Sequence, residues 1–162
     1  MSLQYVIDGY NIINSSHFIH SRVNKKIKDQ RSALLELIKI KGLTGSARNK
    51  IIVVFDGYAH SGLRLDEASL NIKVIFSEEE TADERIMEII QGAANPSSIV
   101  AVSDDNQIRF FARAQKAQVL GVEEFVTRNE KYKKAIDEPL KPELKFSQIQ
   151  HINEELKKIW LR

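Results

Sequence analysis

Aspartates that directly follow short apolar segments are the side chains in this sequence best suited to chemistry. Asp8 follows YVI, Asp56 follows VVF, and Asp104 and Asp105 follow AVS. A further aspartate, Asp83, lies in the segment ETAD at the start of a helical pattern. Carboxylates held a few ångströms apart raise one another's pKa, so such a cluster is unfavourable unless a cation neutralises it. The pattern therefore predicts a divalent metal site.

The chemistry that such a cluster serves best is metal-dependent phosphodiester hydrolysis. Mg²⁺ or Mn²⁺ binds through a few carboxylates and keeps waters or substrate phosphate as its other ligands. The ion can lower the pKa of an attacking water and neutralise charge on the leaving oxygen. We expect catalytic roles for Asp8, Asp56, Asp83 and Asp104, and metal ligation by Asp8, Asp83, Asp104 and Asp105.

Each aspartate also has a purely structural interpretation. Ser103, Asp104 or Asp105 could cap a helix that starts near Asn106, since Ser and Asp are preferred at that position. Asp56 is followed by Gly57, a pair that is common in simple turns. For one aspartate taken alone, a structural role and a role in a metal site are about equally good interpretations. The occurrence of aspartates at several predicted strand ends together favours a site.

The two neighbouring acidic residues Asp83 and Glu84 have different predicted roles. Thr81 and Glu84 have the spacing of a capping box, in which the Glu side chain bonds the backbone at the start of the helix. We therefore expect Glu84 to be structural and Asp83 to be the site residue.

Alternating strand and helix patterns position these residues. Apolar runs at 4–7, 51–55, 72–76, 99–102 and 118–122 predict buried parallel strands. Helical spacing of apolar residues covers 27–41, 81–94 and 106–116, while 57–71 has no such period and is expected to be a surface loop. The result is an α/β fold with a central, mainly parallel sheet of about five strands flanked by helices, whose ligands bind beyond the carboxyl ends of the strands.

Length and composition indicate a single domain over residues 1–162, with a C-terminal helix from about 147. The sequence has no apolar run long enough to cross a membrane and no secretory signal, so we expect a cytoplasmic protein without a membrane partner. The absence of cysteine excludes disulfides, thiolate metal sites and a cysteine nucleophile.

Residues that could bind an RNA chain lie close to the aspartates in sequence. The net charge of +2 is too small to indicate nucleic acid, so the local distribution of charge matters more. Arg109, Arg113 and Lys116 have the spacing of one helix face and could contact phosphates, although such clusters are usually no more than a solvated surface. Tyr10 could stack on a base or pack under a loop, and Asn11 could offer its amide to a phosphate or a metal-bound water.

The motifs together resemble the NYN domains of the PIN-like nuclease superfamily, in particular the YacP-like bacterial ribonucleases. The resemblance rests on DGYN at 8–11, FDG at 55–57, ETAD at 80–83 and VSDD at 102–105, and it covers about residues 5–126. It implies a PIN-like three-layer fold, Mg²⁺ or Mn²⁺ at the acidic cluster, and endonucleolytic cleavage of single-stranded RNA that leaves a 5′ phosphate. For this group it also implies messenger RNA as substrate and a connection with the ribosome. The family's functional positions correspond to Asp8, Asn11, Asp56, Asp83 and Asp104, with Asp105 adjacent.

Two other functions compete with a ribonuclease. One is a PIN-like module that binds RNA or the ribosome without cutting, but the acidic set that such a module would lack is complete here. The other is a metal-dependent phosphatase, since a strand-end Asp can act as a nucleophile. The sequence lacks a DxDxT-type nucleophile motif and the glycine-rich phosphate loops, so this alternative ranks last.

Overall fold

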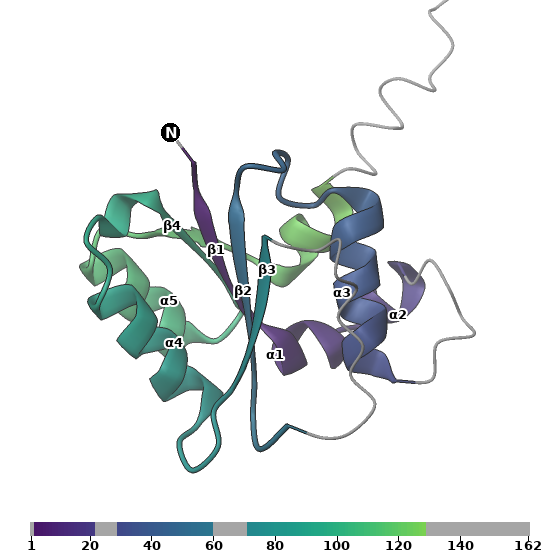
Figure 1. The fold of residues 1–162 in the computed structure, drawn as a ribbon, viewed down its shortest axis with the longest axis horizontal. Helices are drawn as coiled ribbons and strands as arrows, with labels where there is room; N and C mark the ends of the chain where they lie inside the picture. The colour runs from purple at the N-terminus through teal and green to yellow at the C-terminus, as the bar shows by residue number, and fades with distance from the viewer. Residues whose placement is uncertain (1, 22–28, 60–70, 129–162) are drawn as a thin grey trace, which may run out of the picture. The chain divides into compact units, whose positions relative to one another are not determined.

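The computed structural model describes residues 2–21, 29–59 and 71–128, and its centre is a five-stranded sheet (Figure 1). Every pair of neighbouring strands is parallel. The order across the sheet is β3-β2-β1-β4-β5, so the first strand is in the middle. The strands are β1 (Gln4–Asp8), β2 (Lys50–Phe55), β3 (Ile72–Phe76), β4 (Ile99–Val102) and β5 (Gln118–Leu120). The five predicted strands and the α/β fold class are confirmed.

The helices that apolar spacing predicts are present with slightly shorter bounds. They are α3 (Gln30–Lys41), α4 (Ala82–Gln91) and α5 (Asn106–Ala114). Asp29 caps the start of α3, and its side chain accepts a hydrogen bond from the backbone N–H of Arg31. It ends at Gly42, whose φ of +55° is a left-handed conformation that glycine adopts without steric cost.

Several short helices are absent from the sequence prediction. Two of them, α1 (Gly9–Ile13) and α2 (Ser16–Ser21), follow β1 closely, and Asn11 lies in α1. Residues 122–128 are also helical, and a 3₁₀ turn, η1 (Pro96–Ser98), precedes β4. Helices of five or six residues span fewer than two turns, which is too short to produce a clear apolar period.

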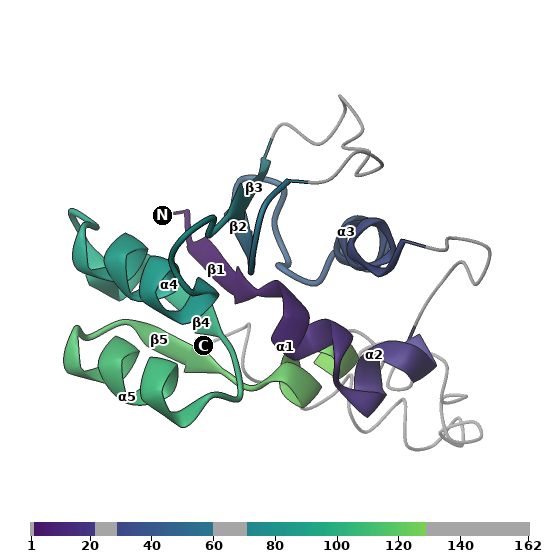
Figure 2. The ribbon, with the colours of Figure 1, turned by 90° about the horizontal axis from the view of Figure 1, so that it is seen from below.

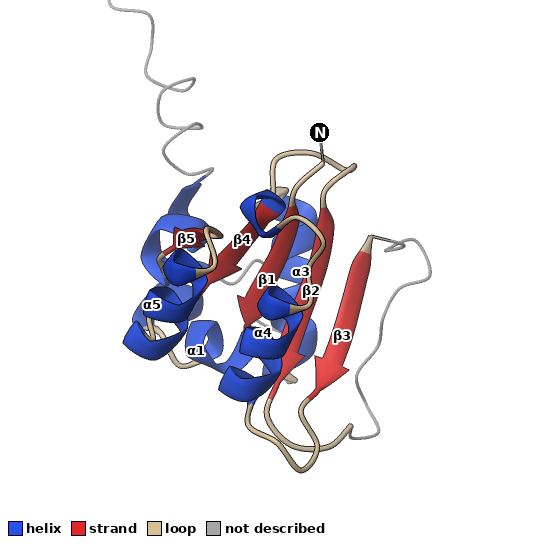
Figure 3. Ribbon diagram, turned by 90° about the vertical axis from the view of Figure 1, so that its left-hand side faces the viewer, coloured by secondary structure: helices blue, strands red, loops and turns tan. Residues whose placement is uncertain are grey.

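The sheet is the middle of three layers (Figures 2 and 3). Helices α4 and α5 cover one face, where Val6 packs in a cluster with Ile86 and Ile108. Helices α1, α2 and α3 and the helical segment 122–128 cover the other face, toward which Tyr5 and Ile7 point. Successive residues of a strand point to opposite faces, so β1 supplies both layers of the core.

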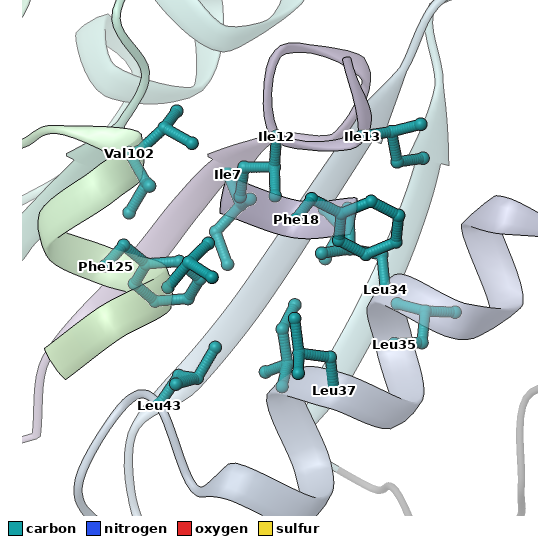
Figure 4. Packing of buried hydrophobic residues seen from close by; sticks show 14 of the residues in the cluster. Ile7, Ile12, Ile13, Phe18, Leu34, Leu35, Leu37, Leu43, Val102 and Phe125 are labelled. Carbon is teal, nitrogen blue, oxygen red and sulfur yellow. The ribbon is translucent and has the colours of Figure 1, made fainter. Parts of the chain in front are cut away.

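The larger of the two core clusters packs against β1 and includes its residues Tyr5 and Ile7 (Figure 4). Phe18, Leu34, Leu37 and Phe125 are buried there and come from three different helical segments. Burial of such side chains contributes roughly 1.5–3 kcal/mol each relative to exposure. This packing fixes β1 and α1, and with them the position of Asp8.

Some predictions fall outside the described residues. These include the C-terminal helix from about 147 and most of the loop at 57–71. In the described part of the chain, none of the helices combines the length and the apolar character needed to cross a bilayer.

Candidate active site

The central strand carries Asp8 to the carboxyl edge of the sheet. Ile7 pairs with Val102 of β4, so the next residues along, Asp8 and Ser103, are level with each other. The Ser103 hydroxyl donates a hydrogen bond to Oδ2 of Asp8 over 3.3 Å. The sequence indicated only a helix-capping role for Ser103, and the register between β1 and β4 is the signal that would have assigned it to Asp8.

Asp8 is an unusual carboxyl because it is only 7% exposed. Burial raises its pKa from 3.8 to about 6, and the negative charge of Asp83, followed by that of Asp56, adds to the rise. The backbone N–H of Asn11 and the Ser103 hydroxyl offset part of this effect. Asp8 nevertheless makes no capping hydrogen bond of good geometry to helix α1. The Asp8 carboxylate is therefore not used to cap α1.

Helix α4 positions Asp83 at this edge. The hydroxyl of Thr81 accepts the N–H of Glu84 at 3.1 Å, and the Glu84 carboxylate accepts the N–H of Thr81 at 3.0 Å. The predicted capping box is confirmed, and Glu84 is used in it. Burial raises the pKa of Asp83, as do the charges of Asp105, Asp56 and Glu84 in that order. Asp83 is thus the half-buried acid that interacts with the other carboxylates.

Asp56 connects strand β2 to the start of α4. Its Oδ1 accepts the backbone N–H of Ala82 at 2.6 Å and the hydroxyl of Ser77 at 3.4 Å. Ala82 is the first residue of α4, whose N–H has no partner within the helix. Asp56 therefore has a structural role, and its charge also reaches Asp8 and Asp83.

Asp104 and Asp105 are adjacent but have different partners. Asp105 caps helix α5, where its Oδ1 accepts the N–H groups of Gln107 at 2.8 Å and Ile108 at 3.2 Å. Its charge is also the largest electrostatic contribution to the raised pKa of Asp83. Asp104 is more exposed, and its Oδ1 accepts the N–H of Val122 at 2.9 Å. The Asp105 carboxylate thus interacts with Asp83, whereas the Asp104 carboxylate binds the chain after β5.

The residues that follow Asp8 pack tightly against β2. A side chain at Gly9 would collide with the ring of Phe55, so only glycine fits there. Tyr10 is half-buried, with its ring centroid 5.3 Å from that of Phe55 in an edge-on arrangement. Of the two interpretations of Tyr10, packing is therefore the one that describes the structure. The Asn11 side-chain oxygen accepts the N–H of Asp104 at 2.9 Å, so it links the ends of β1 and β4.

The three basic residues predicted to share one helix face are placed differently. Arg109 is half-buried, with Nη1 3.4 Å from the Ser103 carbonyl oxygen and 3.9 Å from Oδ1 of Asp104. Arg113 is exposed one turn further along α5. Lys116 lies beyond the end of the helix with φ +65°, so the expectation that it continues the same face is wrong. The chain turns there because the N–H of Ala117 bonds back to the carbonyl of Ala112.

The donor chemistry at this edge suits a hard cation. Asp8, Asp83 and Asp105 supply carboxylate oxygens, the ligand type of Mg²⁺ and Mn²⁺. Within the described ranges, no three histidine or acidic side chains stand close enough to hold one ion together. Mg²⁺ commonly binds through one or two carboxylates with waters completing its shell, so a carboxylate pair fits it.

The fold and the acidic edge together define an α/β protein built as PIN-like nucleases are expected to be, with carboxylates beyond the ends of parallel strands. The family model described as the YacP-like NYN domain matches residues 5–161. The chain belongs to that family, and this membership supports a ribonuclease.

Two kinds of relative agree with this assignment. "Uncharacterized protein YacP" of Bacillus subtilis (strain 168) is 31% identical over 100 residues, which are 60% of this chain and 57% of that protein. The aligned region thus spans little more than half of that relative. The crystal structure of Rae1 (YacP) from Bacillus subtilis has a TM-score of 0.60 and 26% identity, covering 99% of this chain and 88% of that one. Its W164L mutant gives a TM-score of 0.59 at the same identity, covering 85% and 80%.

Proposed function

We propose that this protein is a divalent-metal-dependent endoribonuclease that cleaves single-stranded RNA. The observation that carries the proposal is the placement of buried Asp8 beside Asp83, where burial and the charge of Asp83 raise the pKa of Asp8 to about 6. These two carboxylates come from strand β1 and helix α4, far apart in sequence, and are held close at the carboxyl edge of the sheet. A cation would relieve the repulsion between them.

A bound Mg²⁺ or Mn²⁺ would lower the pKa of an attacking water and neutralise charge on the leaving oxygen. Asp8 and Asp83 are the residues that would hold it, and Asp105 lies within electrostatic reach of Asp83. Metal and proton compete for a carboxylate, so occupancy should increase as the pH rises through the pKa of Asp8. Ser103 orients the Asp8 carboxylate, and Asp56 fixes the start of α4, which carries Asp83.

The remaining site residues have supporting roles in this proposal. Asp104 accepts the N–H of Val122 and lies near Arg109, so it helps to position the turn after β5 and the guanidinium. Arg109 and Arg113 would contact the RNA backbone. The natural substrate proposed is messenger RNA in the cytoplasm, with the ribosome as a partner, on the strength of the likeness to YacP-like ribonucleases.

The test compares RNA with a small phosphate ester. Labelled single-stranded RNA and p-nitrophenyl phosphate are each incubated with the protein in Mn²⁺ and in EDTA. We expect internal RNA cuts in Mn²⁺ alone and no turnover of the ester. Turnover of the ester alone would identify a phosphatase, and RNA binding without cleavage would identify a binding module. Either result would overturn the proposal.

A further inference from the structure

A large aromatic side chain is exposed in the middle of helix α5. Phe110 is 78% exposed, the highest value among the exposed large hydrophobic residues in the described ranges. Its helix is firmly seated, because Ile108 and Ala112 are buried against the sheet. Phe110 therefore does not contribute to the core of the fold. Its exposure to water costs free energy that no packing in the core offsets.

The surroundings of Phe110 are polar and basic. Asn106, Arg113 and Ala114 lie four residues before and three and four residues after it, so they are its neighbours on the helix surface, and all are exposed. The sequence from 106 to 122 contains Arg109, Arg113 and Lys116 but no acidic residue. An exposed aromatic ring beside cations, on a helix that itself carries no carboxylate, is complementary to a ligand with flat rings and negative charge.

The position of α5 relates this surface to the acidic edge. Asp105 caps the helix and is the largest electrostatic contributor to the raised pKa of Asp83. Phe110 lies five residues further on, which is about 7.5 Å along the helix axis. Arg109, which precedes it, reaches back to the carbonyl of Ser103. One rigid helix thus spans from the carboxylates to the exposed ring.

We propose that Phe110 stacks on an unpaired base of single-stranded RNA while Arg113 contacts a neighbouring phosphate. This inference rests on the proposed ribonuclease function and adds a residue that holds substrate outside the metal site. Stacking on an aromatic ring needs no particular base, because every base has a flat face. The surface formed by Phe110 and Arg113 on α5 therefore favours single-stranded over double-stranded RNA, whose bases are already stacked.

The experiment measures binding of a fluorescent RNA oligonucleotide by anisotropy in EDTA, so that cleavage does not interfere. Phe110→Ala should weaken binding roughly 5- to 100-fold, whereas Phe110→Tyr should bind as the wild type does. Ile40→Ala is the matched control, since Ile40 is an exposed apolar residue of helix α3 at 56% exposure. An oligonucleotide without bases should bind weakly and should not distinguish Phe110→Ala from the wild type.

Two further measurements separate stacking on a base from a charge effect and from a loss of folding. The salt dependence of binding should be unchanged in Phe110→Ala and reduced in Arg113→Ala. The unfolding temperature of Phe110→Ala should equal that of the wild type, because an exposed side chain adds little to the core.

Several results would overturn the inference. They are wild-type affinity in Phe110→Ala, absence of RNA binding by the wild type, and a clear fall in the unfolding temperature of Phe110→Ala. Wild-type affinity in Phe110→Leu would also overturn it, because it would indicate a nonspecific apolar contact such as a protein partner. Failure of the proposed function looks different: RNA would bind and depend on Phe110 in EDTA, yet stay uncut in Mn²⁺.

Discussion

Replacing Asp8 by Asn should stabilise the protein when no metal is present. The folded-state pKa of Asp8 is raised from 3.8 to about 6, so the folded protein holds this proton more tightly than the unfolded chain does. The stabilisation from the protonated form is complete below pH 3.8 and is lost as the pH rises through about 6. One pH unit is worth about 1.4 kcal/mol, so ionising Asp8 at pH 7 costs about 3 kcal/mol.

Asn has nearly the shape of a protonated Asp and can still accept the hydrogen bond from Ser103, but it cannot ionise. In EDTA at pH 7, Asp8→Asn should therefore unfold at a temperature roughly 6–12 °C above that of the wild type. The two proteins should converge near pH 4. The assay is thermal unfolding followed by circular dichroism between pH 4 and 8. A wild type and variant that melt alike at pH 7, or that differ equally at every pH, would refute the reasoning.

Three other predictions concern the neighbouring residues. Asp83→Asn should abolish RNA cleavage and lower the pKa of Asp8 seen by NMR titration. Glu84→Gln keeps the capping geometry and should retain most activity. The reverse pattern would contradict the assignment of Asp83 to the site and Glu84 to the cap. Asp56→Ala should lower the free energy of unfolding by about 1–2 kcal/mol in denaturant titrations, because the Ala82 N–H loses its partner; unchanged stability would argue against this cap. The double change Arg109→Ala and Arg113→Ala should reduce the slope of log affinity against log salt by about 1–2. An unchanged slope would show that neither side chain contacts the RNA backbone.

The sequence was sufficient to predict the sheet and its edge. Apolar runs bounded by polar residues mark buried parallel strands, and their carboxyl ends must lie together. The division of labour between Asp83 and Glu84 was also predictable, because a capping box depends on residues only three apart. Such local rules need no knowledge of the tertiary structure.

The partner of Asp104 was not predictable, because it depends on a contact distant in sequence, whereas the cap that Asp105 makes on α5 was one of the alternatives that the sequence offered. Asp104 binds the N–H of Val122, eighteen residues away. The sequence could not show that Asn11 would use its side-chain oxygen on the backbone of Asp104. Lys116 departs from the helix face because the chain turns with a positive φ at a residue that is not glycine. The expected metal ligation by Asp104 thus stays a prediction, whereas its backbone contact is seen directly.

The rate of RNA cleavage as a function of Mn²⁺ concentration tests the central claim most directly, with the wild type compared to Asp83→Asn. A 5′-labelled single-stranded RNA is incubated at pH 7.5 with Mn²⁺ buffered over several decades, and the ends of the products are mapped. We predict no cleavage in EDTA, a saturable increase with Mn²⁺, internal cuts that leave 5′ phosphates, and almost no activity in the variant at any concentration. Wild-type cleavage that persists undiminished in EDTA, or a variant as active as the wild type, would contradict this mechanism.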